Sequence, residues 1–369
     1  MKRPARILMA AGGTGGHIYP AIAVAHAVRR QVPDSAVAFA GTQDRIEWDA
    51  VPRAGYPIYP ITAAAISRSS AAANLKVPLK LLKGVRQSLR LVRDFDADVV
   101  FGAGGFVAGP VGLAAWMSRR PLVIQEQNAF AGVTNRLLGR VAEQIHIAFP
   151  EAAGAFPEDQ VVLSGNPVRA ELVGVDRAEA RKRLGLPETG PVVLSFGGSG
   201  GSQALNEALL EGLDHFLAQT DAHLYWQTGS RYHERVVAQA PSHPRVHIHE
   251  YLHDMPAAYA AADIALCRSG ASTCAELLVT GTPALLVPSP NVAEDHQTHN
   301  ARSLVTVGAA ELLPEAELRE QWVARVRQLL TQAETLSTMR KAAAETRITD
   351  AADRIAGSIL RLAERRAAA

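Results

Sequence analysis

The sequence predicts an α/β protein with two doubly wound domains, each built around a parallel sheet. The chain of 369 residues is too long for a single ordinary domain and is long enough for two domains, each with a sizeable hydrophobic core. Apolar runs alternate with helical patterns along the chain, which is typical of parallel sheets joined by right-handed crossovers. In addition, the stretch AAGGTGGHIYPAIAVAHAV at residues 10–28 returns in similar form as SFGGSGGSQALNEALLEGL at residues 195–213. This repeat predicts that the same structural unit opens both domains.

Each copy of the repeat has the pattern of a strand, a glycine loop and a helix. In the first copy the apolar run 5–11 precedes the glycines, and Ile22, Ala25 and Val28 then recur at helical spacing. In the second copy the run 191–198 takes the place of that strand. Near-continuous apolar runs are typical of buried parallel strands. We expect further strands of this kind at 36–41, 97–102, 121–126, 223–229, 262–267 and 283–288.

The boundary between the domains is expected near 161–174, where the tripeptide GNP interrupts the pattern of strands and helices. The first domain is then 1–164 and the second is 165–341. The last segment, 342–369, has helical character, and we expect it to form a helix that packs back on the first domain.

Composition describes a globular protein and disfavours several function classes. Apolar residues make up 48% and charged residues 20%, and the formal net charge of +2 gives no reason to expect a nucleic-acid partner. Two cysteines, Cys267 and Cys274, cannot form a disulfide framework, which favours a reducing compartment and a packing role for both. The uncharged stretch 99–117 contains five glycines and Pro110. These residues favour a strand, a glycine loop and a helix over a membrane span.

The glycine loops favour phosphate binding over a merely tight turn. Glycines reach positive φ, and the following helix presents free N–H groups to an anion. Neither loop contains the G-K-[ST] of a P-loop, and Ile18 stands where a dinucleotide fingerprint has its third glycine. A P-loop ATPase and a nicotinamide dehydrogenase are therefore disfavoured. A third glycine cluster follows the strand at 97–102 and consists of Gly102, Gly104, Gly105 and Gly109.

His17 directly follows the first glycine loop. Two interpretations stay open for this residue. It is either a histidine bonded to a backbone carbonyl at a helix N-terminus, or a general base beside a phosphate-type loop.

Seven motifs, taken together and in order, resemble those of the MurG family. They are GGTGGHIYPAIAVA, GAGGFVAGP, QEQNAFAGVTNR, SGNPVR, GGSGGSQALN, CRSGASTCAE and DHQTHNA, and the resemblance covers essentially the whole chain. It implies a GT-B fold, in which two Rossmann-like domains face a cleft. It also implies inverting transfer of N-acetylglucosamine from UDP-N-acetylglucosamine to the C4 hydroxyl of lipid-linked N-acetylmuramyl-pentapeptide, which turns lipid I into lipid II in peptidoglycan synthesis. The chain departs from the family at three positions. The family often has a histidine in place of Gln125, and an aromatic hydroxyl and a serine or threonine are common in place of Phe106 and Ala108, which have no side-chain hydrogen-bond donor.

The resemblance places the donor on the second domain. Glu276, expected in the first turn of a helix, would accept hydrogen bonds from the ribose. The alternative is that Glu276 binds no ligand and stands there because a carboxylate is stabilised near a helix N-terminus. Arg169 would pair with the diphosphate, Ser199 would bond a phosphate oxygen, and Leu252 would hold the uracil through its backbone. The helix N-terminus near Thr273 would face the diphosphate. The remaining donor-site residues are Ala271, Ser272, Cys274, Ala275, Gln297 and Asn300.

On the first domain, the resemblance assigns the acceptor and the acid–base chemistry. His17 is the first candidate for the general base and Glu126 the second. The acceptor diphosphate would lie on Gly13, Gly104 and Gly105, and the other substrate-binding residues are Thr14, Gly15, Gly16 and Asn128. No DxD motif stands out, so we expect no metal and no other cofactor, with Arg169 and a helix dipole stabilising the leaving group.

A histidine cluster, formed by His243, His247, His249 and His253, raises the alternative of a zinc site. Its spacing matches no closed zinc site and no cysteine joins it, so solvated surface histidines are favoured.

Residues 50–93 contain no acidic side chain but eight basic ones, and leucines recur there at helical spacing. A core-facing helix with a solvated basic face is one interpretation. The other, which we favour, is contact with an anionic membrane surface, which would make this a peripheral protein on the cytoplasmic face of the cell membrane. The residues expected to touch the membrane are Leu75, Lys76, Leu79, Lys80, Leu82, Lys83 and Trp116.

Two other functions fit the same fold. A UDP-N-acetylglucosamine epimerase would need no lipid acceptor. A non-catalytic nucleotide-sugar sensor would bind the donor without turnover.

Overall fold

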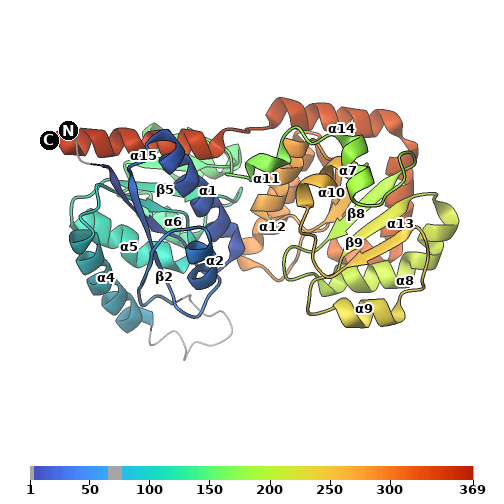
Figure 1. Ribbon diagram of the computed structural model, residues 1–369, viewed down its shortest axis with the longest axis horizontal. Helices are drawn as coiled ribbons and strands as arrows, with labels where there is room; N and C mark the ends of the chain where they lie inside the picture. The colour runs from blue at the N-terminus through green and yellow to red at the C-terminus, as the bar shows by residue number, and fades with distance from the viewer. Residues whose placement is uncertain (1–3, 65–76, 369) are drawn as a thin grey trace. The chain divides into compact units, whose positions relative to one another are not determined.

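The computed structural model describes residues 4–64 and 77–368. The chain divides into two compact units, the first formed by Met1–Val168 and Asp350–Ala369 and the second by Arg169–Thr349 (Figure 1). The division after Val168 and the boundary drawn from the sequence after residue 164 lie in one loop.

The first unit is built on a seven-stranded sheet with the order β3-β2-β1-β4-β5-β6-β7. All of its pairings are parallel, and β1 lies between β2 and β4, with Leu8 opposite Ala38 on one side and Val100 on the other. The strands are β1 Arg6–Ala10, β2 Ala36–Gly41, β3 Ile58–Pro60, β4 Val99–Gly102, β5 Leu122–Glu126, β6 Gln144–Ile147 and β7 Val161–Leu163.

Helices cover both faces of this sheet. They are α1 Gly15–Gln31, α2 Glu47–Arg53, α4 Val77–Asp94, α5 Gly105–Met117, α6 Val133–Leu138 and α15 Ala351–Ala368, with 3-10 turns at Pro150–Ala155 and Glu158–Gln160. On one face, apolar residues of α1 and α15 pack together against the central strands, and Figure 1 shows these two helices side by side. On the other face, α4, α5 and α6 contribute to a second buried layer.

The second unit repeats this plan with a six-stranded sheet of order β10-β9-β8-β11-β12-β13. Its strands are β8 Val192–Phe196, β9 His223–Gln227, β10 Val246–His249, β11 Ile264–Cys267, β12 Ala284–Leu286 and β13 Ala310–Leu312, and every pairing is parallel. Its helices are α7 Arg177–Arg183, α8 Gln203–Gln219, α9 His233–Gln239, α10 Met255–Ala261, α11 Ala271–Thr280, α12 His296–Thr306, α13 Leu318–Thr331 and α14 Ala333–Thr346. Short 3-10 turns lie at Ala170–Leu172, Ala293–Asp295 and Glu315–Glu317.

The expected strands are all present, and the structure has further strands that are not among those expected above. These are β3, β6, β7, β10 and β13, each three or four residues long. Strands this short carry too little periodicity to stand out from a loop. The repeat also differs in detail, because α1 begins at Gly15 whereas α8 begins at Gln203, three residues beyond the matching Gly200.

The single helix expected over 342–369 is wrong, since α14 ends at Thr346 and α15 begins at Ala351. Arg347 has an extended backbone with φ −62° and ψ 140°. The β-branched Ile348 and Thr349 that follow disfavour a continuous helix. Asp350 then accepts the Arg354 N–H at 3.0 Å and opens α15, which belongs to the first unit.

The uncharged run 99–117 forms β4, a glycine loop and α5. Across the described part of the chain, none of the helices combines the length and apolar character needed to cross a membrane.

Candidate active site

Both sheets place their glycine loops at equivalent points. In the first unit β1 lies beside β4, and in the second β8 lies beside β11, so that in each sheet the strand order reverses there. The loops that leave the carboxyl ends of two such strands diverge, which is where doubly wound sheets bind their ligands. The loops concerned are those after β1, β4, β8 and β11, and most of the site residues predicted from the sequence lie in these loops or at the starts of the helices that follow them.

In the first unit the loops after β1 and β4 touch through their glycines. A Cβ placed on Gly105 would lie 2.3 Å from the carbonyl oxygen of Gly12, and one placed on Gly104 would lie 3.0 Å from Nδ1 of His17. Gly13, Gly104 and Gly105 also have φ of +95°, +87° and +73°, which L side chains rarely adopt. Side chains at these positions would therefore separate the two loops.

His17 is a half-buried residue in the first turn of α1. Its Nδ1 lies 3.0 Å from the carbonyl oxygen of Ala103 and 3.1 Å from Oε1 of Gln127. Both partners only accept hydrogen bonds, so Nδ1 carries a hydrogen and the neutral ring keeps a lone pair on Nε2. The bond to a backbone carbonyl, which was the first of the two interpretations of His17, is thus present. It also gives the ring the tautomer that a general base needs.

Glu126, at the end of β5, is buried and its carboxylate is fully bonded. It accepts from the Asn128 N–H at 3.0 Å, the Asn128 side chain at 3.2 Å, the Gly132 N–H at 3.0 Å and the Asn135 side chain at 2.9 Å. Asn135, on α6, was not singled out from the sequence. These bonds give Glu126 the role of holding Asn128 and the loop 127–132 in place, and they do not support its use as a base.

The three positions that depart from the MurG pattern have different surroundings. Gln125 is fully buried, where it donates to Oδ1 of Asn166 at 3.1 Å, and Ala108 is fully buried as well. Phe106 lies beside the first glycine loop, because a Cβ on Gly13 would come 2.8 Å from its ring. The departures at 108 and 125 therefore change internal packing, and the one at 106 changes the wall of the loop.

The first turn of α1 offers polar groups to a ligand. Thr14 is exposed at the N-cap, and its side chain makes no capping bond with any residue in the described ranges. The amides of Gly15 and Gly16 precede the first N–H that pairs within the helix, which is that of His17.

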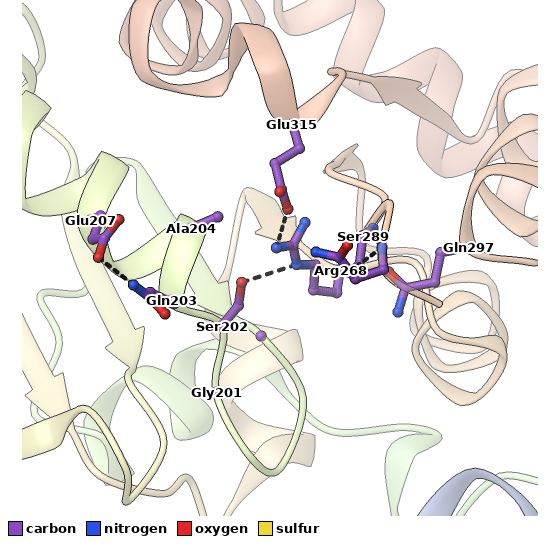
Figure 2. Close-up of a pocket in the computed structure, with 11 residues that line it drawn as sticks. Gly201, Ser202, Gln203, Ala204, Glu207, Arg268, Ser289, Gln297 and Glu315 are labelled. Carbon is purple, nitrogen blue, oxygen red and sulfur yellow. Dashed lines mark hydrogen bonds and ion pairs between the residues drawn. The ribbon is translucent and has the colours of Figure 1, made fainter. Parts of the chain in front are cut away.

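In the second unit a cavity of about 460 Å³ opens beside the glycine loop (Figure 2). Ser199 is exposed at the tip of this loop. A Cβ on Gly201 would lie 2.0 Å from the carbonyl oxygen of Thr228, so this loop also needs its glycines. The cavity is lined by Gly197, Gly201, Ser202, Gln203, Ala204, Glu207, Arg268, Ser289, Asn291, Gln297 and Glu315.

Arg268 fixes one wall of this cavity, as Figure 2 shows. Its Nε donates to Oγ of Ser202 at 3.0 Å, its Nη1 donates to the carbonyl of Val287 at 3.1 Å, and its guanidinium forms an ion pair with Glu315. Ser202 is also the N-cap of α8 and accepts from the Leu205 N–H. Arg268 thus joins the glycine loop to the loop after β12, a role that the sequence analysis missed.

Glu276 lies in the second turn of α11 and not in its first turn, which corrects the expectation from the sequence. Its Oε2 accepts from the Tyr259 hydroxyl at 2.8 Å, and its Oε1 lies 3.8 Å from Nη2 of Arg169. Burial raises the pKa of Glu276, while the Tyr259 hydrogen bond and the Arg169 charge lower it. Attraction to the helix N-terminus falls off within the first turn, so it does not explain this carboxylate.

The N-terminus of α11 presents free backbone groups. The first amide that pairs within the helix is that of Cys274, which donates to Gly270 at 2.9 Å. The N–H groups of Ala271, Ser272 and Thr273 have no partner among the residues that the structure describes. They form the kind of site that binds an anion.

The remaining donor-site candidates divide into ligand-facing and internal residues. The Leu252 N–H donates to Oε1 of Gln227 at 2.9 Å, so the Leu252 carbonyl is the backbone group of this residue that could bind a nucleotide base. Gln297 lines the cavity, and its Oε1 accepts from the Ser289 N–H at 2.9 Å. Asn300 is fully buried and donates to the Ser269 carbonyl at 3.2 Å, so it holds the loop. Cys274 is fully buried and Ala275 nearly so, and direct ligand contact is not supported for either.

The histidine cluster is less solvated than expected. His247 and His249 lie on β10 and are half-buried, and burial lowers the pKa of both. His247 Nε2 lies 3.1 Å from Nδ1 of His223 on the neighbouring β9. Within the described residues no three histidine, cysteine or acidic side chains are grouped so that they could hold a metal.

The predicted apolar stripe of α4 is buried only in its C-terminal half. Val85 and Val92 lie in the core, whereas Leu79 and Leu82 are 71% and 49% exposed, beside the exposed Lys80 and Lys83. Trp116, on α5, is 54% exposed. Leu75 and Lys76, also predicted to touch a membrane, lie outside the described residues.

Family models match this chain in both units. The glycosyltransferase family 28 N-terminal domain matches residues 7–147, and the glycosyltransferase family 28 C-terminal domain matches residues 192–355. The crystal structure of Acinetobacter baumannii MurG is 32% identical, with a TM-score of 0.76 over 97% of this chain and 100% of that chain. The protein belongs to the MurG family. A relative in Salinibacter ruber (strain DSM 13855 / M31), named as a UDP-N-acetylglucosamine--N-acetylmuramyl-(pentapeptide) pyrophosphoryl-undecaprenol N-acetylglucosamine transferase, is 51% identical, and the match covers 98% of each chain.

As a MurG family member the chain is a glycosyltransferase, and its predicted fold class, two Rossmann-like doubly wound domains of the GT-B type, is confirmed. A relative of the same name in Phocaeicola vulgatus is 38% identical over 99% of this chain and 98% of that protein. The UDP-N-acetylglucosamine 2-epimerase of Neisseria meningitidis has a TM-score of 0.66 at 15% identity, over 96% of this chain and 100% of that chain. This likeness shows a shared fold and gives no support to the epimerase alternative.

Proposed function

We propose that this MurG family chain moves N-acetylglucosamine from UDP-N-acetylglucosamine to the C4 hydroxyl of lipid-linked N-acetylmuramyl-pentapeptide, with inversion, in peptidoglycan synthesis. The observation that carries the proposal is the 51% identity, along 98% of each chain, to a relative whose name gives this donor and this acceptor. Two glycine loops, at equivalent points of two similar sheets, support it because each substrate contains a diphosphate.

The second unit is proposed as the donor domain. The Leu252 carbonyl accepts from the uracil, and Glu276 accepts from the ribose hydroxyls. Arg169 and the free amides at the start of α11 face the diphosphate, together with Ser199 in the glycine loop. Gln297, which lines the cavity, completes the contacts to the sugar nucleotide.

The first unit is proposed as the acceptor domain. Thr14 and the amides of Gly15 and Gly16 bind polar groups of the substrates. Gly13, Gly104 and Gly105 have no side chain, so the acceptor diphosphate can approach the backbone closely at these positions. Asn128, held by Glu126, contacts the transferred sugar.

The reaction is a single displacement at the anomeric carbon. The acceptor O4 forms the new bond to C1 while the bond from C1 to the UDP oxygen breaks, and the electron pair leaves on UDP. The proton of the C4 hydroxyl passes to Nε2 of His17, whose Nδ1 is kept protonated by Ala103 and Gln127. The charge of Arg169 and the α11 amides stabilise the diphosphate as negative charge develops, so this scheme uses no metal.

We also propose that the protein is peripheral, on the cytoplasmic face of the membrane, where it meets its lipid acceptor. The exposed leucines and lysines at the start of α4 support this, since apolar insertion and attraction to anionic lipid act together there.

The test is transfer of radiolabelled N-acetylglucosamine from UDP-N-acetylglucosamine to a lipid-diphosphate acceptor, with epimerised UDP-sugar measured in the same samples. We expect labelled lipid product only when both substrates are present, and no epimer. Labelled epimer without lipid product would favour the epimerase alternative. Donor binding without either product would favour a sensor.

A further inference from the structure

The second unit holds a buried tyrosine behind the residue proposed to bind the ribose. Tyr259, on α10, is only 1% exposed, and its hydroxyl donates to Oε2 of Glu276 at 2.8 Å. Burial and the Glu276 charge raise the pKa of Tyr259 well above its usual value, so the hydroxyl keeps its proton and remains a donor.

The position of Tyr259 is itself well fixed. Its ring packs edge-on against Phe196, with centroids 5.8 Å apart and an interplanar angle of 87°. Phe196 is the last residue of β8, directly before the glycine loop that begins at Gly197. The tyrosine hydroxyl therefore reaches Glu276 from a ring that is anchored on the strand carrying that loop.

Within the described residues, one oxygen of the Glu276 carboxylate accepts a hydrogen bond and the other accepts none. Tyr259 donates to Oε2, whereas Nη2 of Arg169 lies 3.8 Å from Oε1, beyond hydrogen-bond distance. The side chain of Glu276 is 17% exposed, so it lies between the core and solvent. A free glutamate loses rotamer entropy when it orders around a ligand, and a partner that orders it beforehand reduces that loss.

We propose that Tyr259 is a positioning residue for donor binding, which fixes the Glu276 carboxylate in the orientation that accepts the ribose hydroxyls. This inference rests on the proposed function, in which Glu276 binds the ribose of UDP. Tyr259 touches neither substrate and acts through Glu276.

The test compares binding of UDP and of 2′-deoxy-UDP by calorimetry. Tyr259→Phe keeps the ring and its packing on Phe196 and removes only the hydroxyl. We expect UDP affinity to fall about tenfold and the preference for UDP over 2′-deoxy-UDP to shrink. In a Glu276→Ala background, Tyr259→Phe should cause no further loss of UDP affinity.

The matched control is Tyr225→Phe. Tyr225 is also a buried tyrosine of the second unit, on β9, and its hydroxyl has no hydrogen-bond partner within the described residues. We expect this variant to bind UDP like the wild type. The thermal midpoint of each variant is measured as well, to check that a loss of UDP affinity does not come from unfolding of the protein.

A second readout is the pH dependence of kcat/KM for the donor. The Tyr259 hydrogen bond and the Arg169 charge both lower the pKa of Glu276, and the thiol of the neighbouring Cys267 stays neutral because burial raises its pKa. Removing the hydroxyl should move the acid limb of the profile to higher pH. A general loss of packing would expose Glu276 and move the acid limb to lower pH, because burial raises the pKa of this carboxyl.

The outcomes separate this inference from the proposed function. If Tyr259→Phe binds both nucleotides with wild-type affinity, the positioning role is wrong while the transferase proposal stands. If its effect persists in the Glu276→Ala background, Tyr259 acts by another route and the inference is overturned. If the wild type binds no UDP at all, the proposed function fails and the inference fails with it.

Discussion

Nδ1 of His17 lies 3.0 Å from the carbonyl oxygen of Ala103, a residue 86 positions further along the chain. The contact joins the glycine loop after β1 to the loop after β4 and settles which ring nitrogen carries hydrogen. The neutral ring thereby keeps the lone pair of Nε2, the atom proposed to accept the proton.

The first prediction concerns this ring. Replacing His17 by alanine removes the proposed base, and we expect kcat to fall by about 10²- to 10⁴-fold with little change in KM for UDP-N-acetylglucosamine, because most of the proposed donor contacts lie in the second unit. Steady-state transfer assays measure both constants. The control is His26→Ala, on the same helix, whose Nδ1 bonds the Tyr56 hydroxyl at 2.9 Å. A His17→Ala enzyme as fast as this control would exclude a base role.

The second prediction separates loop contact from backbone strain. Gly105 and Gly55 both lie in the first unit with φ of +73° and +82°, but only Gly105 has a backbone atom, the Gly12 oxygen, within 2.3 Å of an added Cβ. Gly55→Ala should cost about 1–2 kcal/mol of unfolding free energy for its left-handed backbone. Gly105→Ala should cost a further ~1–3 kcal/mol from the clash. Urea unfolding of the two variants tests this, and equal losses would show that the loops do not need their close approach.

The third prediction concerns the exposed end of α4. Substituting both Leu79 and Leu82 by aspartate should lower binding to phosphatidylglycerol vesicles at least about tenfold, because apolar insertion is lost and charge repulsion is added. The thermal midpoint should stay near that of the wild type, since both side chains are largely exposed. Co-sedimentation measures the binding, with Val237→Asp on α9, a 51% exposed site, as the control. Equal binding by the two variants would rule out this end of α4 as the membrane contact.

The fourth prediction concerns stability at low pH. His146, on β6, is fully buried, neither ring nitrogen has a hydrogen-bond partner among the described residues, and burial with the nearby Arg361 charge lowers its pKa from 6.5 to about 4. The folded chain therefore binds a proton less readily than the unfolded chain. No stability is lost above pH 6.5, and the loss grows as the pH falls towards 4, to about 3 kcal/mol.

His146→Leu should remove this part of the pH dependence. Denaturant unfolding at pH 7 and pH 4.5 gives the two free energies, and we expect the difference between them to be smaller in the variant than in the wild type. The same difference in both proteins would show that other groups cause the acid sensitivity.

Much of the fold follows from the local pattern, because buried parallel strands and glycine loops leave clear signals in the sequence. The repeat placed β1 and β8, and the loops that follow them, at equivalent points. What the pattern could not show are contacts between distant residues. Gln127 bonds a histidine 110 positions away, and Arg268 bonds Ser202 across 66 positions. Such pairs are formed by the topology of the sheets, and one sequence contains no record of them.

The same limit applies to residue roles. Glu126 and Glu276 both stand in motifs that resemble those of a known family, and both suggested direct chemistry. Only the hydrogen bonds distinguish them, since Glu126 accepts four from its own loop and helix α6, whereas Glu276 has one oxygen that accepts no hydrogen bond from the described part of the chain.

The position of α15 has a consequence for biosynthesis. Ile355, Ile359 and Leu362 of this helix are buried against the sheet and α1 of the first unit, yet they follow the entire second unit in the chain. The ribosome synthesises the chain from its N-terminus. The apolar surface of β1 and α1 therefore stays uncovered until α15 has been made. The second unit, whose residues are continuous, completes its core earlier. The half that is translated first is therefore the half that finishes folding last.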